Sequence, residues 1–292
     1  MKVIRSLLWI LGLSLSAELS ASTWQLRGLL QSTAVQAAPG PVYSFQDNES
    51  FDLFNKPEAR LLQRHEVMGA TPNGGRTEGH FEGRIGLLRA TASASYPYCC
   101  DIAGHRINQG YTHTSVQGQF YDTISVFGGG LAFGTAVRYT VHLDISGRLS
   151  QPNGEMGGFL SADGLAEVRL TDLTTRQSSI LSWNAKQDAV GQYLLSLDTF
   201  VGHELGLNGM LYAAASVSDY AQTARSTFAD FGHSALFELS SSVAGMNLMG
   251  ASGHDFARQT QPQPVPAPAS LALVAVGLLA WRLVCGFSVR AA

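Results

Sequence analysis

The chain has 292 residues, enough for one or two domains with a full hydrophobic core. Charged residues make up 14% of it, against about 25% in an average soluble domain, and its 31 glycines exceed the usual share of about 7%. The formal net charge is -3, and the few Lys and Arg residues are scattered. The chain therefore lacks the basic footprint of a nucleic-acid-binding protein, and its composition is typical of an exported, turn-rich β protein.

Residues 1–22 have the pattern of a secretory signal peptide. Lys2 and Arg5 give a positively charged start, Leu7 to Leu15 form an apolar run, and Ala17 to Ser22 supply small residues for cleavage. A membrane anchor is the alternative interpretation. The apolar run is too short to cross a hydrocarbon core of ~30 Å, so a cleaved signal is favoured.

Strand patterns dominate residues 23–248, which we expect to form one exported domain. In the segment AVRYTVHLDIS, apolar residues from Val137 to Ile145 alternate with polar ones, which predicts a strand with one buried face and one face in water. Weaker alternation recurs at 90–96, 119–127, 166–173, 193–200 and 211–218. The predicted fold is all-β: an antiparallel β-sandwich of jelly-roll type, with one short helix.

Glycine and asparagine residues lie between the predicted strands. We expect hairpin turns at 128–130, 152–154, 163–164, 206 and 208–209, because such residues adopt the positive φ angles that hairpin turns require.

The segment NKPEARLLQRHEV breaks the strand pattern. Asn55 could cap a helix, Pro57 would lie in its first turn, and Leu61, Leu62 and His65 follow at helical spacing. The sequence predicts a helix of two or three turns here.

Cys99 and Cys100 are the cysteines expected in the mature protein, since Cys285 lies in the C-terminal tail. An oxidising compartment favours their oxidation, and adjacent cysteines can join only through a strained ring. We expect a vicinal disulfide. An intermolecular bridge, or a metal or redox pair, remains as an alternative, although adjacent thiolates lack the spacing of zinc ligands.

No pattern of histidines or acids indicates a catalytic, metal or cofactor site. His142 and Asp144 share the polar face of one predicted strand, but two ligands do not make a metal site. We interpret this pair as a solvated strand face, and three further pairs invite the same caution: His65 with Glu66, His80 with Glu82, and His203 with Glu204.

Hydrolysis has equally weak support in the sequence. The Gly-x-Ser-x-Gly motif is absent, and a glycosidase requires two carboxylates at a defined separation, which the sequence cannot measure for a pair such as Glu155 and Glu167. Trp24 and Trp183 could stack on sugar rings, but single aromatic residues in a β protein more often pack in the core or at an edge.

The chain ends in an apolar segment behind a run of prolines. Residues 249–268 read as a linker that contains four prolines from Pro262 to Pro268, and 269–292 as a transmembrane helix with a short basic tail. Arg282 and Arg290 lie toward the carboxyl end, which predicts a cytoplasmic tail. A buried core helix is the alternative interpretation.

This arrangement resembles the PEP-CTERM proteins, substrates of the bacterial exosortase sorting system. The matching residues are Val265, Pro266, Ala267 and Pro268, where the family typically reads Val-Pro-Glu-Pro, followed by small and leucine-rich positions. The stretch STFADFGHSALFEL, Ser226 to Leu239, also looks like the Ala-Asp-Phe-x-His-(Ser/Thr)-Ala stretch with which many such ectodomains end. The resemblance implies that this stretch forms a final sandwich strand.

The resemblance also implies a route for the protein. The route comprises export by the secretion machinery, transient anchoring in the inner membrane of a Gram-negative-type bacterium, and cleavage by an exosortase-type enzyme near Pro266 and Pro268. Delivery to the cell surface or the exopolysaccharide matrix would follow. We therefore expect a non-enzymatic structural or interaction protein, with a carbohydrate-binding module as the second hypothesis and a glycoside hydrolase or lyase as the third.

Overall fold

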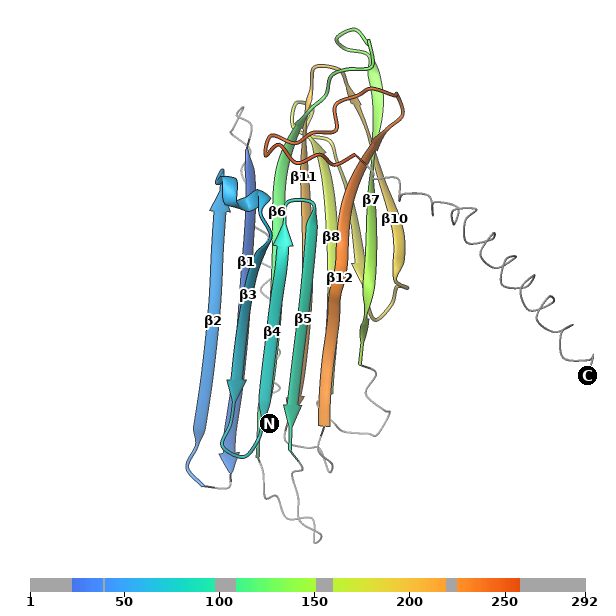
Figure 1. Ribbon diagram of the computed structural model, residues 1–292. Helices are drawn as coiled ribbons and strands as arrows, with labels where there is room; N and C mark the ends of the chain where they lie inside the picture. The colour runs from blue at the N-terminus through green and yellow to red at the C-terminus, as the bar shows by residue number, and fades with distance from the viewer. Residues whose placement is uncertain (1–22, 39, 98–108, 151–159, 219–224, 258–292) are drawn as a thin grey trace, which may run out of the picture. The chain divides into compact units, whose positions relative to one another are not determined.

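The computed structural model describes residues 23–38, 40–97, 109–150, 160–218 and 225–257 (Figure 1). The chain divides into two compact units, Met1–Ala257 and Arg258–Ala292, and all of the described residues lie in the first unit.

The described residues form two six-stranded antiparallel sheets. The first sheet has the order β2 (Tyr43–Phe54), β1 (Trp24–Ala38), β6 (Gln109–Ser125), β11 (Glu204–Ser218), β8 (Leu160–Asp172), β9 (Ser178–Asn184). The second has the order β10 (Gly191–Phe200), β7 (Ala136–Leu149), β12 (Arg225–Ser241), β5 (Leu87–Tyr96), β4 (Arg76–Arg84), β3 (Gln63–Ala70).

The two sheets pack face to face as the layers of a sandwich (Figure 1). Strand β5 lies against β6 and β11, β4 lies against β1 and β6, and β12 lies against β8 and β11. The predicted all-β, antiparallel architecture is therefore confirmed.

Alternation along the strands builds the core between the layers. In β7, Val137, Tyr139, Val141, Leu143 and Ile145 are all buried, as their spacing predicts. Aromatic rings from the two sheets meet in the middle: Phe120 and Phe237 pack edge to face at 4.9 Å, and Trp183 and Phe231 at 5.5 Å.

Several glycines that were expected in turns lie inside strands. The prediction of turns at 163–164, 206 and 208–209 is wrong, because these residues lie inside β8 and β11. A Cβ atom on Gly164 would lie 2.3 Å from the Phe231 ring, and one on Gly209 would lie 2.3 Å from the Phe120 ring. These glycines make room for core aromatic rings. The predicted turn at 128–130 does have three glycines with positive φ.

The predicted helix after Asn55 is also wrong in extent. Only one 3-10 turn forms, at Pro57–Arg60, and β3 begins at Gln63. Asn55 has a φ of 50° and closes the end of β2, where its side chain accepts a hydrogen bond from the Trp24 amide at 2.8 Å. The residues from Gln63 onward alternate as a strand, which buries Val67.

A segment that we call the C-terminal strap, residues 243–257, follows β12 and packs back onto the sandwich. Phe256 and Ser252 are buried, and the Leu239 amide donates to the Phe256 carbonyl at 2.6 Å. The chain therefore stays in the folded unit through Ala257, beyond the predicted linker boundary at 249.

Buried Asp122 on β6 holds this strap. Its carboxylate accepts hydrogen bonds from the Ser252 hydroxyl at 2.5 Å and from the Ser252 amide at 3.1 Å. Burial raises the pKa of Asp122 to about 6, although hydrogen bonds from Ser252, Thr123 and Ala251 act in the opposite direction.

Several predicted features lie outside the described residues: the signal peptide, the turn at 152–154, Cys99 and Cys100, the sorting motif at 265–268 and the transmembrane helix. Within the described ranges, no helix is both long and apolar enough to cross a bilayer.

Candidate functional site

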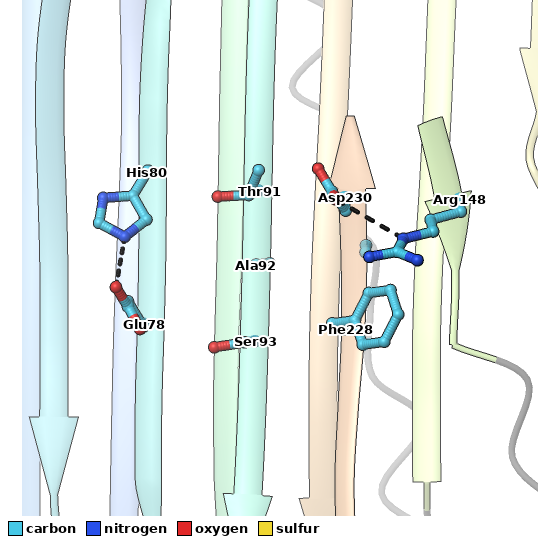
Figure 2. Close-up of a pocket in the computed structure, with 9 residues that line it drawn as sticks. Glu78, His80, Thr91, Ala92, Ser93, Arg148, Phe228 and Asp230 are labelled. Carbon is cyan, nitrogen blue, oxygen red and sulfur yellow. Dashed lines mark hydrogen bonds and ion pairs between the residues drawn. The ribbon is translucent and has the colours of Figure 1, made fainter. Parts of the chain in front are cut away.

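The outer face of the second sheet carries a shallow trough (Figure 2). Its volume is about 310 Å³, at the lower end of the range for ligand pockets. The lining side chains come from four adjacent strands: Glu78 and His80 on β4, Thr91 and Ser93 on β5, Phe228 and Asp230 on β12, and Arg148 on β7. We call this set the β5 trough.

The trough exists because small side chains on β5 lie between larger ones on its neighbours. Ser93 pairs with Glu78 on one side and with Phe228 on the other. Two residues along the same face, Thr91 pairs with His80 and Asp230. Since neighbouring strands are ~4.8 Å apart, the two walls stand about 10 Å apart across the floor.

The β4 wall is a carboxylate and imidazole pair. Glu78 Oε1 lies 2.5 Å from His80 Nε2, and the Glu66 carboxylate on β3 lies 3.6 Å from His80 Nδ1. All three side chains are substantially exposed, so these contacts are solvated and contribute little to stability.

A β-bulge shapes the opposite wall. The pairing of β12 with both β5 and β7 shifts register between Asp230 and Ala235, and Asp230 Oδ1 accepts the Gly232 amide at 3.1 Å. The other carboxylate oxygen lies 3.8 Å from Arg148 Nε, beyond hydrogen-bond distance. The Arg148 guanidinium lies over the Phe228 ring, 5.2 Å from its centre.

The bulge coincides with the stretch Ala229 to Ala235, which sequence resemblance singled out. As predicted, this stretch belongs to the last strand, β12. Asp230 in it both closes the bulge and lines the trough.

The two carboxylates of the trough turn in different directions. Glu78 turns along its own strand toward His80, and Asp230 turns toward Arg148 (Figure 2). Their register puts the two backbones about 12 Å apart, from two strand spacings and two residues along a strand. Neither side chain leans across the trough toward the other, as a catalytic carboxylate pair would.

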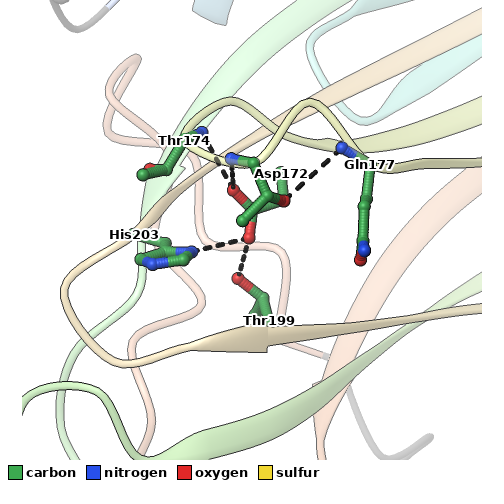
Figure 3. A network of polar contacts seen from close by, with 6 residues as sticks. Asp172, Thr174, Gln177, Thr199 and His203 are labelled. Atoms are coloured by element: carbon green, nitrogen blue, oxygen red, sulfur yellow. Dashed lines mark hydrogen bonds and ion pairs between the residues drawn. The ribbon is translucent and has the colours of Figure 1, made fainter.

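A second polar cluster surrounds Asp172 at the end of β8 (Figure 3). Its buried carboxylate accepts hydrogen bonds from His203 Nδ1 and Thr199 Oγ1, each at 2.7 Å, and from the amides of Thr174 and Thr175. Burial alone would raise the pKa of Asp172, but the hydrogen bonds from His203, Thr175 and Thr199 outweigh it and lower the pKa.

This cluster holds the β8–β9 turn against the loop that follows β10. An Asp and His pair also occurs in hydrolase triads, where the second ring nitrogen activates a nucleophile. In the described ranges, no serine, threonine or cysteine side chain hydrogen-bonds to the His203 ring. The arrangement has the geometry of a turn cap.

The aromatic residues singled out in the sequence are packed in the sandwich. Trp183 is 1% exposed and donates to the Ala189 carbonyl at 2.8 Å. Trp24 is partly buried, donates to the Lys56 carbonyl, and has Arg60 over its ring at 5.4 Å. Neither ring is open for stacking on a sugar, so the interpretation as core or edge packing is confirmed.

The histidine and acid pairs noted in the sequence are not partners of each other. His65 lies 2.5 Å from Glu49 and stacks on Phe51, and His80 contacts Glu78 and Glu66. His142 contacts Ser240 at 2.8 Å, and Glu167 lies 3.6 Å from Arg169. Glu155 lies outside the described residues.

Across the part of the chain that the structure describes, no group of three His, Cys, Asp or Glu residues is placed to hold a metal ion. Sequence reasoning missed Glu78, Arg148 and Phe228. The sequence marks each of these residues only by its place on the outward-facing side of a strand. Strand pairing brings them together, and the sequence does not reveal that pairing.

Comparisons of this chain with protein-family models, with curated proteins and with solved structures found no match.

Proposed function

We propose that this chain is an exported protein of the cell surface or exopolysaccharide matrix, with a non-enzymatic structural or interaction role. It is sorted through its PEP-CTERM-like tail and cleaved by an exosortase-type enzyme near Pro266 and Pro268. Its folded part is a jelly-roll-type sandwich that remains after processing.

The observation that carries this proposal is the order of segments along the chain. A signal-like apolar segment precedes one folded unit, the last described residue of that unit is Ala257, and the proline-rich segment and apolar tail follow. The fold adds support, because two sheets with charged and polar outer faces suit a protein that works in water.

The non-enzymatic role is supported by the geometry of the β5 trough. The trough is shallow and open, and its two carboxylates turn away from each other. Such a surface can hold a ligand but does not enclose a reacting bond.

The test is intact mass with terminal peptide mapping of the protein recovered from the membrane and extracellular fractions of its host. We expect a mature form that lacks residues 1–22 and everything after the region of Pro266 and Pro268. A double variant, Pro266→Ala with Pro268→Ala, should accumulate with its tail in the membrane fraction. Pro262→Ala, which changes a proline outside the motif, is the matched control.

A mature wild-type protein that retains residues 271–292 would overturn the sorting part of the proposal. It would identify the chain as a tail-anchored membrane protein.

A further inference from the structure

The β5 trough combines hydrogen-bond donors and acceptors on both of its walls. Glu78 and Asp230 offer carboxylate oxygens, His80 and Arg148 offer ring and guanidinium nitrogens, and the floor carries the hydroxyls of Thr91 and Ser93. A ligand that fits must present hydroxyl groups able both to donate and to accept.

Part of this hydrogen-bonding capacity is not used within the protein. Asp230 Oδ2 lies 3.8 Å from Arg148 Nε, too far for a hydrogen bond, and the Arg148 side chain is 73% exposed. Its guanidinium has five N–H donors and lies over Phe228 without a close carboxylate. Both groups can therefore bond to a ligand without breaking a strong internal contact.

The charges of the walls disfavour anionic ligands. Two carboxylates, Glu78 and Asp230, face a single arginine, so an anionic polymer would meet net repulsion. A metal ion would require a cluster of ligands that the described residues do not form.

A peptide that binds by adding a strand is disfavoured by the backbone. Adding a strand requires an unpaired sheet edge, but the floor of the trough is β5, which pairs with β4 on one side and β12 on the other. A ligand that matches polar walls, a partly exposed ring and a floor of hydroxyls is an uncharged chain of hydroxyl-bearing rings.

We propose that the β5 trough binds sugar residues of a neutral polysaccharide. Glu78 and Asp230 accept sugar hydroxyls, Arg148 donates to them, and Phe228 contacts the apolar C–H face of a ring. This inference rests on the proposed function, because it supplies the ligand that an interaction protein of a polysaccharide matrix would hold.

Affinity electrophoresis tests the proposal with the full chain, purified in mild detergent. Native gels contain one neutral polysaccharide each (dextran, galactomannan or hydroxyethyl cellulose), and a parallel gel contains alginate as the acidic polymer. We expect at least one neutral polysaccharide to retard the chain, and alginate to leave its mobility unchanged.

Two variants locate the binding to the trough. Thr91→Trp fills the floor without changing charge, and Asp230→Asn removes one charged acceptor. Each should weaken the affinity about tenfold or more: Thr91→Trp by blocking the floor, and Asp230→Asn by losing a hydrogen bond to a charged group. Thr140→Trp is the matched control: Thr140 lies on the same outer face in β7, about 27 Å along the strand from Arg148, and this variant should bind as the wild type does.

The proposal is overturned if none of the three neutral polysaccharides retards the wild-type chain, or if Thr91→Trp is retarded as strongly as Thr140→Trp. Thermal melts of each variant show whether it is folded. If Thr91→Trp does not fold, Phe228→Ala takes its place.

This assay does not depend on processing of the tail. Loss of binding with normal processing removes only the ligand assignment. Binding with an unprocessed tail removes only the sorting route.

Discussion

The contact between Ser252 and Asp122 gives a sharp test of how the C-terminal strap is held. In Ser252→Ala the buried Asp122 carboxylate loses the hydroxyl that donates to it at 2.5 Å. The His254 amide loses the same hydroxyl as the acceptor of its hydrogen bond at 3.1 Å. A hydrogen bond to a charged group contributes about 1.5–3 kcal/mol, and a partly buried amide left unpaired costs about 1 kcal/mol more. We expect a loss of about 3 kcal/mol, which lowers the melting temperature of a domain of this size by about 6–12 °C.

The loss should depend on pH. Because the folded-state pKa of Asp122 is raised from 3.8 to about 6, its contribution to stability is fully present below pH 3.8 and is lost as the pH rises through about 6. The Ser252 hydroxyl favours the charged carboxylate, so its removal raises this pKa further. Ser252→Ala should therefore be more destabilised at pH 7 than at pH 4.

Thermal unfolding followed by circular dichroism at pH 4 and pH 7 measures both effects. Ser196→Ala is the matched control, because its hydroxyl contacts Thr140 on an exposed strand face and its loss should change stability by less than about 0.5 kcal/mol. A Ser252→Ala protein that melts within about 2 °C of the wild type at pH 7 would refute the reasoning.

Two further predictions concern close packing and a buried histidine. Gly118→Ala places a Cβ atom 2.1 Å from the Phe81 ring and should lower the free energy of unfolding, measured by chemical denaturation, by about 1–3 kcal/mol. Adding Phe81→Leu should recover part of that loss. Equal stability of Gly118→Ala and the wild type would contradict the packing argument. Burial, helped by nearby Arg84, lowers the pKa of His254 from 6.5 to about 4, so its contribution to stability is full above pH 6.5 and is lost as the pH falls through about 4. His254→Gln should flatten the stability profile over this window, and an unchanged profile would count against the assignment.

The sequence predicted the strands well wherever a strand has one buried and one solvated face. The alternation from Val137 to Ile145 is of this kind, and all of its apolar positions are buried. Such a pattern depends on residues two apart in the chain, and therefore needs no knowledge of the partner strand.

The predictions that were wrong share a physical cause. Gly164 and Gly209 belong to dipeptides that are typical of turns, but aromatic rings on distant strands lie where a larger side chain would be. Leu61, Leu62 and His65 have helical spacing, but pairing of β3 with β4 decides the conformation of this segment from Gln63 onward. Tertiary contacts prevail over local preference at these positions.

The β5 trough was beyond prediction for a related reason. His80 and Asp230 are 150 positions apart in the sequence and line the same trough only because both pair with Thr91. The sequence marked Asp230 through a motif, but nothing local indicates which residues lie opposite it. The register of the strand pairs decides which residues share this surface. Sequence patterns do not reveal that register for strands that are far apart in the chain.

The C-terminal strap determines how the protein would bear a mechanical load. Any tension on the chain beyond Ala257 reaches the fold first at Ala257, where a single bridge to Leu239 is backed by the hydrogen bond between Leu239 and Phe256. Further back along the strap, the Phe256 ring packs on Phe120, and Ser252 then contacts Asp122. These contacts are loaded one after another, so the strap would peel away before the force acts on the hydrogen-bonded ladders of the two sheets. We therefore expect the strap to unfold under load while the two sheets of the sandwich stay folded.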